Sequence, residues 1–134
     1  MHRQASGPFE VKRTAMDSVD AGQGAAFGRM RFEKRFHGDL EASSVVEMLS
    51  AGNPAAGSAG YVAVEHVVGT LHGRAGSFML QHTGVMDRGT SSLQVTVVPG
   101  TGTGALADLA GMLVIAIADD GAHAYTFDYA IGDD

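Results

Sequence analysis

The chain has 134 residues, a length that predicts one domain over residues 1–134 built around a single core. Hydrophobic residues make up 45% and charged residues 18%, which excludes a disordered chain, and the lack of cysteine excludes disulfides and thiolate metal sites. The net charge of −6 argues against a broad nucleic-acid-binding surface, although Arg29, Arg31, Lys34 and Arg35 form a local basic cluster. We expect no nucleic-acid partner and no cofactor.

No apolar run of signal-peptide length follows the N-terminal residues. The longest apolar run covers residues 111–118, far short of the roughly 18 residues that a membrane-spanning helix needs. We therefore expect a cytoplasmic protein that does not partner with a membrane.

Most of the chain alternates apolar and polar residues with the period of two that is typical of β-strands. The pattern predicts strands over residues 7–14, 27–40, 61–72, 77–86, 93–98, 112–118 and 123–131. In the second of these, Met30, Phe32, Phe36 and Leu40 share one face, which only Lys34 interrupts. The other face is mostly charged, as in a half-buried antiparallel strand.

Residues 42–49 fit two elements equally well. Ala42, Val45, Val46 and Leu49 have helical spacing, Asp39 could cap a helix and Gly52 could end it. If the segment is a strand, the count rises to eight, and eight antiparallel strands with short turns close into a small barrel without exposed edges.

The segment LQVTVVPGTGTGALADLAGMLVI, residues 93–115, resembles the strand, glycine-rich turn and strand signature of allene oxide cyclases and dirigent proteins. Over nearly its full length the chain is more similar to an uncharacterised bacterial family, a domain of unknown function with that barrel. The matching stretches are FHGDLEASSVVEMLSAG, GSAGYVAVEHVVGTLHGRAGSFMLQHTGVM, GTGTG and YTFDYAI.

The resemblance implies an all-β, eight-stranded antiparallel barrel of the calycin-like type, in which residues 42–49 form a strand and which is often oligomeric. It implies no reaction, because the family has no assigned activity. The acidic, amide and cysteine side chains expected around a cyclase substrate have no matching positions here, so cyclase activity is not carried over.

Residues 61–72 and 77–86 flank GRAG and predict a β-hairpin. With an even loop, His72 faces Ser77, and Glu65 and His82 become diagonal neighbours on an otherwise apolar face, within reach of each other. With an odd loop, His66 instead lies opposite His82. Two histidines could then bind a metal ion, but the sequence offers no obvious third ligand. We predict no bound metal.

The even register suggests a site made of one acid, one imidazole and the nearby phenol of Tyr61. These side chains could anchor a small apolar or amphipathic molecule, which is the function we predict. An isomerase or cyclase that uses Glu65 and His82 as acid and base is the alternative, and a filled barrel serving only as an oligomeric scaffold is another. Whether the protein is an enzyme stays open.

Glu47 adds a fourth candidate ligand-binding residue. If residues 42–49 form a strand, it shares a partly apolar face with Val45 and Leu49, although the pattern favours a solvent-facing position. The GTGTG loop imitates a dinucleotide-binding fingerprint, but too few residues follow it for the required crossover helix. Its glycines are better suited to a sharp bend between antiparallel strands.

Residues 111–118 are apolar on both faces of the predicted strand. One face can fill the barrel, and the other needs a cover if it is not to contact water. We expect that cover to be another copy of the chain in a homo-oligomer, with a helix packed over the wall as the alternative.

Overall fold

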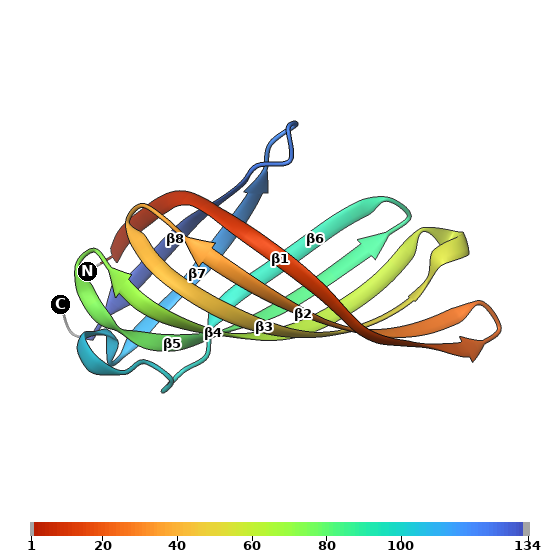
Figure 1. The fold of residues 1–134 in the computed structure, drawn as a ribbon, viewed down its shortest axis with the longest axis horizontal. Coiled ribbons are helices and arrows are strands. Elements are labelled where there is room, and N and C mark those ends of the chain that lie inside the picture. Colours follow the sequence, from red (N-terminus) through yellow and green to blue (C-terminus); the bar gives the residue numbers. More distant parts are fainter. Residues whose placement is uncertain (1, 133–134) are drawn as a thin grey trace.

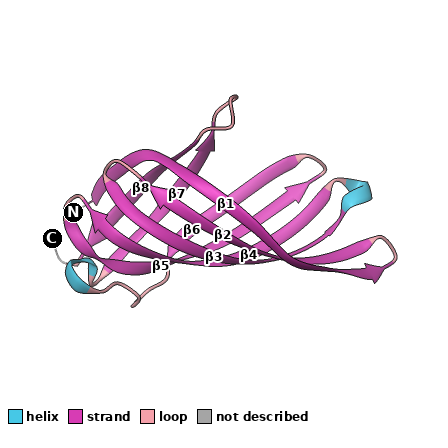
Figure 2. Ribbon diagram, in the orientation of Figure 1, coloured by secondary structure: helices cyan, strands magenta, loops and turns pink. Residues whose placement is uncertain are grey.

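Eight antiparallel strands close into one barrel in the computed structural model, which describes residues 2–132 (Figures 1 and 2). The strands are His2–Gly22 (β1), Ala25–Phe36 (β2), Leu40–Asn53 (β3), Ser58–Leu71 (β4), Arg74–Asp87 (β5), Thr90–Val97 (β6), Leu109–Ile117 (β7) and His123–Ile131 (β8). Two short 3-10 turns, Pro54–Ala56 (η1) and Gly104–Leu106 (η2), complete the fold. Each strand pairs with the next, and β1 pairs with β8. The predicted barrel is confirmed, and the ambiguous segment is strand β3.

Tight turns set the register of the long hairpins. His72 and Gly73 join β4 to β5 with φ angles of 48° and 80°, and Arg88 and Gly89 join β5 to β6 with 47° and 88°. Two central residues with positive φ match the twist of the flanking strands, and glycine adopts this conformation at little cost.

The predicted GRAG loop was the wrong place for the β4–β5 turn. The two-residue turn pairs Leu71 with Arg74, so Glu65 lies opposite Leu80 and His82 lies opposite Ala63. The register therefore differs from the predicted one by an even number of residues. Because side chains alternate with a period of two, an even shift leaves each residue on its predicted face, and Glu65 and His82 remain diagonal neighbours.

One end of the barrel is packed solid with aromatic and aliphatic side chains. The largest buried ones are Tyr125, Tyr129, Phe36, Phe78, Phe127, Leu40, Leu71, Leu80 and Leu106. Leu106 comes from η2, which lies at this end of the barrel (Figure 1). The hydroxyl of Tyr125 donates to the carbonyl of His37 (2.7 Å) and accepts from the amide of Leu40 (2.8 Å), which ties the β2–β3 connection to the core.

The GTGTG loop forms the predicted bend between β6 and β7. Gly100 and Gly104 have φ angles of 80° and 59°, a conformation that favours glycine. The hydroxyl of Thr101 accepts from the amide of Met79, and that of Thr103 accepts from the amide of Ser77, both at 3.0 Å. The loop therefore closes the packed end by docking on β5.

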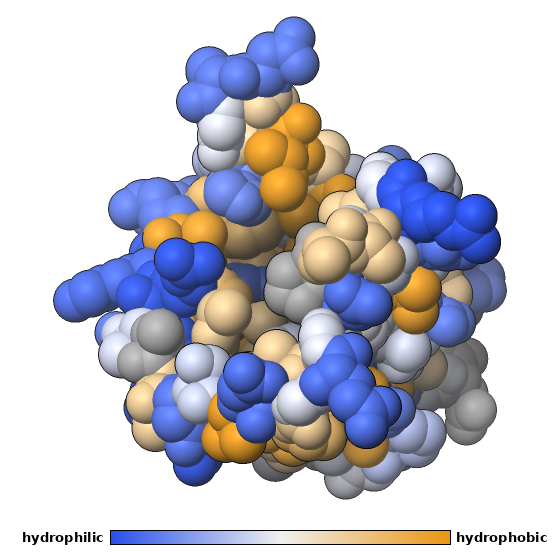
Figure 3. All heavy atoms as spheres, turned by 90° about the vertical axis from the view of Figure 1, so that its right-hand side faces the viewer, coloured by the Kyte–Doolittle hydropathy of each residue, from blue (hydrophilic) through white to orange (hydrophobic). Residues whose placement is uncertain are grey.

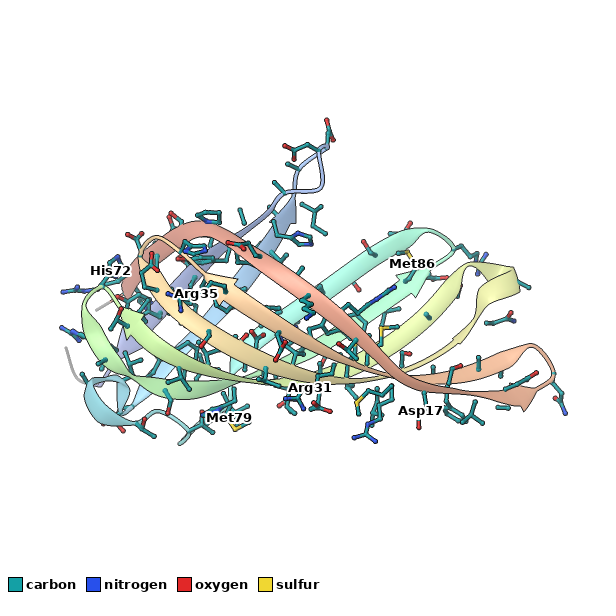
Figure 4. The ribbon with its side chains drawn as sticks, viewed as in Figure 1. Asp17, Arg31, Arg35, His72, Met79 and Met86 are labelled. Atoms are coloured by element: carbon teal, nitrogen blue, oxygen red, sulfur yellow. The ribbon has the colours of Figure 1, made fainter. Side chains whose placement is uncertain are left out.

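The opposite end of the barrel opens. β1 pairs with β8 only over residues 2–9, and β6 pairs with β7 only at Val95 and Thr96. Beyond these pairs, the β1–β2, β3–β4 and β5–β6 hairpins extend away from the β7–β8 hairpin (Figure 1). Figure 4 marks the two ends, with His72 near the packed end and Met86 near the open end.

Parts of the outer wall are apolar and uncovered. Met112 and Val114 of β7 are 45% and 56% exposed, and within residues 2–132 no helix packs over them. A second apolar stretch runs along β4, whose Val62, Val64 and Val68 are each about half exposed. Among residues 2–132 the helical segments η1 and η2 have three residues each, so neither could span a membrane.

Candidate functional site

A buried polar cluster separates the packed half of the barrel from the open half. The Glu65 carboxylate accepts hydrogen bonds from His82 Nε2 (2.7 Å) and Lys34 Nζ (3.2 Å) on Oε1, and from Ser44 Oγ (2.6 Å) on Oε2. These residues come from β2, β3, β4 and β5, and inward alternation along each strand directs them to the same level. The Glu65 side chain is 0% exposed, and those of His82 and Lys34 are 6% and 8% exposed.

The cluster holds Glu65 in its ionised form. Burial alone would raise the pKa of Glu65, but the hydrogen bond from His82, the positive charge of Lys34 and the hydrogen bond from Ser44 together lower it below its ordinary value. Lys34 Nζ also lies 5.2 Å from the ring centroid of Phe9 and 5.8 Å from that of Phe36, and the faces of aromatic rings attract a cation. The buried carboxylate is thus balanced by a buried ammonium group.

A cavity of about 240 Å³ lies on the open side of this cluster. Residues from all eight strands line it: Phe9, Val11, Phe32, Lys34, Val46, Met48, Tyr61, Ala63, His82, Leu93, Ile115, Ile117 and His123. Most of this lining is apolar, and the polar groups gather at a few points, as in small-molecule sites. Figure 3 looks onto the open end and shows a hollow flanked by apolar residues.

Two nitrogen-bearing groups at the floor of the cavity retain free hydrogen-bonding capacity. His82 uses Nε2 for Glu65, and its Nδ1 has no hydrogen-bond partner among residues 2–132. Every fully buried side-chain nitrogen or oxygen among residues 2–132 has a hydrogen-bond partner. Nδ1 has none, so it is not fully buried and is accessible from the cavity that His82 lines. Lys34 has three N–H donors and hydrogen-bonds only Glu65 within the same residues. Glu65 itself does not line the cavity.

Tyr61 lies farther toward the open end, on the cavity wall. Its ring covers Gly84 on β5, where an added Cβ would lie 2.1 Å from Tyr61 Cε1. Glycine is therefore required for the ring to take this position. Burial raises the pKa of the Tyr61 hydroxyl, so this group is a neutral hydrogen-bonding group at neutral pH.

The structure thus brings together three of the four predicted site residues, Tyr61, Glu65 and His82, but not Glu47. Glu47 lies on the outer face of β3, where Arg29 (3.8 Å) and Arg31 (3.4 Å) pair with its carboxylate. Figure 4 shows Arg31 on the outside of the barrel. The solvent-facing position is therefore the correct one, and Glu47 is not a site residue: Val45 and Leu49, which share its face, belong to the apolar outer wall.

The odd-loop alternative with paired histidines is wrong. His66 lies opposite Met79 on the outer face, whereas His82 points inward opposite Ala63. Among the described residues, no group of three or more histidine, aspartate or glutamate side chains has a geometry that could hold a metal ion.

Sequence reasoning missed Lys34 and Ser44 as members of the cluster. The signal for Lys34 was present, since it is the single charged residue on the apolar face of its strand. It was assigned instead to the exposed basic cluster of Arg29, Arg31 and Arg35, which belongs to the other face. Ser44 gave no signal, because serine is common on both faces of a strand.

Comparisons with known proteins agree with this fold. The model of the family described as "Protein of unknown function (DUF3224)" matches residues 5–129. A crystal structure of a protein with unknown function from the same family, from Shewanella oneidensis MR-1, is 44% identical, with a TM-score of 0.90. That alignment covers 98% of this chain and 99% of the other. No curated protein matched. The specific relationship to allene oxide cyclases and dirigent proteins is not confirmed.

Proposed function

Because the chain belongs to DUF3224, a family defined without an activity, we infer its function from the barrel itself and propose that it binds a small amphipathic molecule. The observation that carries the proposal is the cavity in the open half, whose floor presents Lys34 and His82 and whose walls are apolar. A molecule with a polar head and an apolar tail would satisfy both surfaces, with its head at the floor and its tail toward the opening.

The size of the cavity limits the ligand. A water molecule occupies about 30 Å³ of the liquid, so a cavity of about 240 Å³ offers the space of roughly eight waters. That volume is slightly below the ~300 to 1,000 Å³ of most ligand pockets, which favours a molecule of about ten non-hydrogen atoms. Eight-carbon straight chains are therefore suitable probes.

The isomerase or cyclase alternative has less support. Glu65 is sealed from the cavity and all of its hydrogen bonds go to protein side chains, so it does not reach a bound molecule. In such an enzyme His82 Nδ1 would carry the proton, with Glu65 as a positioning residue behind it. Turnover that disappears in His82→Asn while binding persists would favour this second function.

Equilibrium dialysis with radiolabelled octanoate and 1-octanol tests the binding proposal. Ala63 lines the cavity opposite His82, so Ala63→Leu fills part of the space and should weaken binding of either probe at least tenfold. Val64→Leu is the matched control, because Val64 is 47% exposed on the outer face. Binding of neither probe to the wild-type protein, or equal binding to Ala63→Leu, would contradict the proposal.

We also propose that the barrel self-associates through the outer face of β4. Between Ser58 and Leu71 the only Asp, Glu, Lys or Arg residue is Glu65, which points inward, so the outer face of β4 carries none of these residues and His66 is its one imidazole. Leu49 of β3 and Val85 of β5, 59% and 48% exposed, extend this apolar face on either side. A second copy offers an equally apolar surface, and isologous pairing would remove both from water.

A further inference from the structure

We propose that the head group of the bound molecule is a carboxylic acid, held between Lys34 and His82 and taken up together with one proton. The inference rests on the proposed binding function and assigns the chemical class of the ligand. It follows from which donors and acceptors the cavity floor offers and from the charge that the floor can accommodate.

The floor presents a donor beside an acceptor. Lys34 Nζ and His82 Nε2 contact the same oxygen of Glu65, so their two side chains lie next to each other. Lys34 has N–H groups to donate. Glu65 is ionised and therefore accepts the Nε2 proton, so in the neutral form of the imidazole Nδ1 is an acceptor facing the cavity.

A carboxyl group matches this arrangement in both of its forms. In a neutral acid, the carbonyl oxygen accepts from Lys34 and the hydroxyl donates to His82 Nδ1. If the proton moves onto Nδ1, a carboxylate accepts from both groups, and the hydrogen bonds become charge-assisted. A hydroxyl head can donate to Nδ1 and accept from Lys34 through its single oxygen, but it stays neutral and therefore gains no charge-assisted hydrogen bonds.

Charge balance requires the added proton. Without a ligand, the ionised Glu65 and the Lys34 ammonium neutralise each other in a site that is almost sealed from solvent. A bare carboxylate would add an uncompensated buried charge, which is strongly unfavourable. One proton, on His82 or on the acid, restores neutrality, so the complex holds one more proton than the free protein and the free carboxylate at neutral pH.

Two other titratable groups, Tyr61 and His123, line the cavity. Tyr61 lines the wall, but burial raises the pKa of its hydroxyl, so it stays neutral across the tested range. His123 also lines the cavity and packs against the Phe9 ring with centroids 5.2 Å apart. It has no carboxylate partner within residues 2–132, and His123→Gln provides a control for its contribution.

The experiment compares octanoate with 1-octanol, which have the same chain and differ in the head group. We expect octanoate to bind at least tenfold more tightly than 1-octanol at pH 7. Its affinity should fall about tenfold between pH 7.5 and pH 8.5, while the affinity of 1-octanol stays constant. Calorimetry in two buffers of different ionisation enthalpy should show uptake of close to one proton per octanoate in wild-type protein and in His123→Gln.

Variants localise the effect. Lys34→Met and His82→Asn should each remove the preference for octanoate, and Glu47→Gln, on the outer face, should preserve it. If Lys34→Met or His82→Asn does not fold, the pH dependence and proton uptake of the wild-type protein still decide the question.

The outcomes separate the two proposals. Equal or tighter binding of 1-octanol, or octanoate binding without proton uptake, would overturn the carboxylic acid inference and leave the binding function intact. Failure of both probes to bind would overturn the binding function as well.

Discussion

Replacement of Glu65 by glutamine tests the buried cluster on which the site depends. The carboxylate is 0% exposed and accepts hydrogen bonds from three side chains. The glutamine amide has one accepting oxygen and one donating nitrogen, so it cannot accept on both sides, and Lys34 loses the negative charge that balances it. Removing one partner of a buried ion pair typically costs about 3–5 kcal/mol.

That loss of stability is large compared with the protein's total free energy of unfolding. A chain of 134 residues is expected to have a free energy of unfolding of about 7–20 kcal/mol. At roughly 3–5 °C per kcal/mol for a domain of this size, Glu65→Gln should lower the melting temperature by about 9–25 °C. Urea denaturation and thermal unfolding followed by circular dichroism measure both quantities.

Two further variants make the test specific. Glu47→Gln removes an exposed carboxylate that also contacts two cationic side chains, and should cost no more than about 1 kcal/mol. Adding Lys34→Met to Glu65→Gln removes the unbalanced ammonium, so the double variant should be destabilised by less than the sum of the single variants. If Glu65→Gln costs no more than Glu47→Gln, or if the two cluster variants are simply additive, the reasoning is refuted.

Three more predictions concern pH, packing and assembly. The folded-state pKa of Glu65 is lowered, so the stabilisation from its ionised form is fully present above the ordinary glutamate pKa of about 4.3 and is lost as pH falls through the folded-state pKa. The difference in unfolding free energy between wild type and Glu65→Gln should therefore shrink from pH 7 to pH 3. A difference that grows over this range would contradict the assignment. Gly84→Ala should displace the Tyr61 ring and cost about 1–3 kcal/mol in urea denaturation, and Tyr61→Ala should relieve that cost; equal losses with and without the ring would show that the contact is not responsible. If the outer face of β4 joins two copies, Val62→Thr with Val64→Thr should reduce the mass measured by light scattering to that of one chain, whereas an unchanged oligomer would place the interface elsewhere.

The sequence predicts the faces of the strands better than their register. Alternation alone places Glu65 and His82 on one inward wall, because any even shift of the hairpin preserves the face of every residue. The register itself depends on the backbone of a two-residue turn at His72 and Gly73. The glycines at both ends of GRAG instead favoured a four-residue loop in the prediction.

The remaining cluster residues depend on contacts between strands that are distant in sequence. Lys34 and Glu65 lie on β2 and β4, which are separated by β3, and their contact requires the curvature of a closed barrel. Pairing between neighbouring strands does not predict such a contact. Where both faces of a strand are partly apolar, the sequence does not show which face points into the barrel. Glu47 was grouped with the site for this reason.

Chemical shift changes in a methyl-resolved carbon–proton NMR spectrum, recorded during titration with octanoate, test most directly whether the open half of the barrel is a ligand site. Ala63 and Ile115 line the cavity, and Val64, one residue after Ala63, faces outward and is 47% exposed. Binding in the cavity predicts saturable shifts at Ala63 and Ile115 with little change at Val64. Shifts confined to Val64 and the outer wall, or no saturable shifts at all, would contradict it.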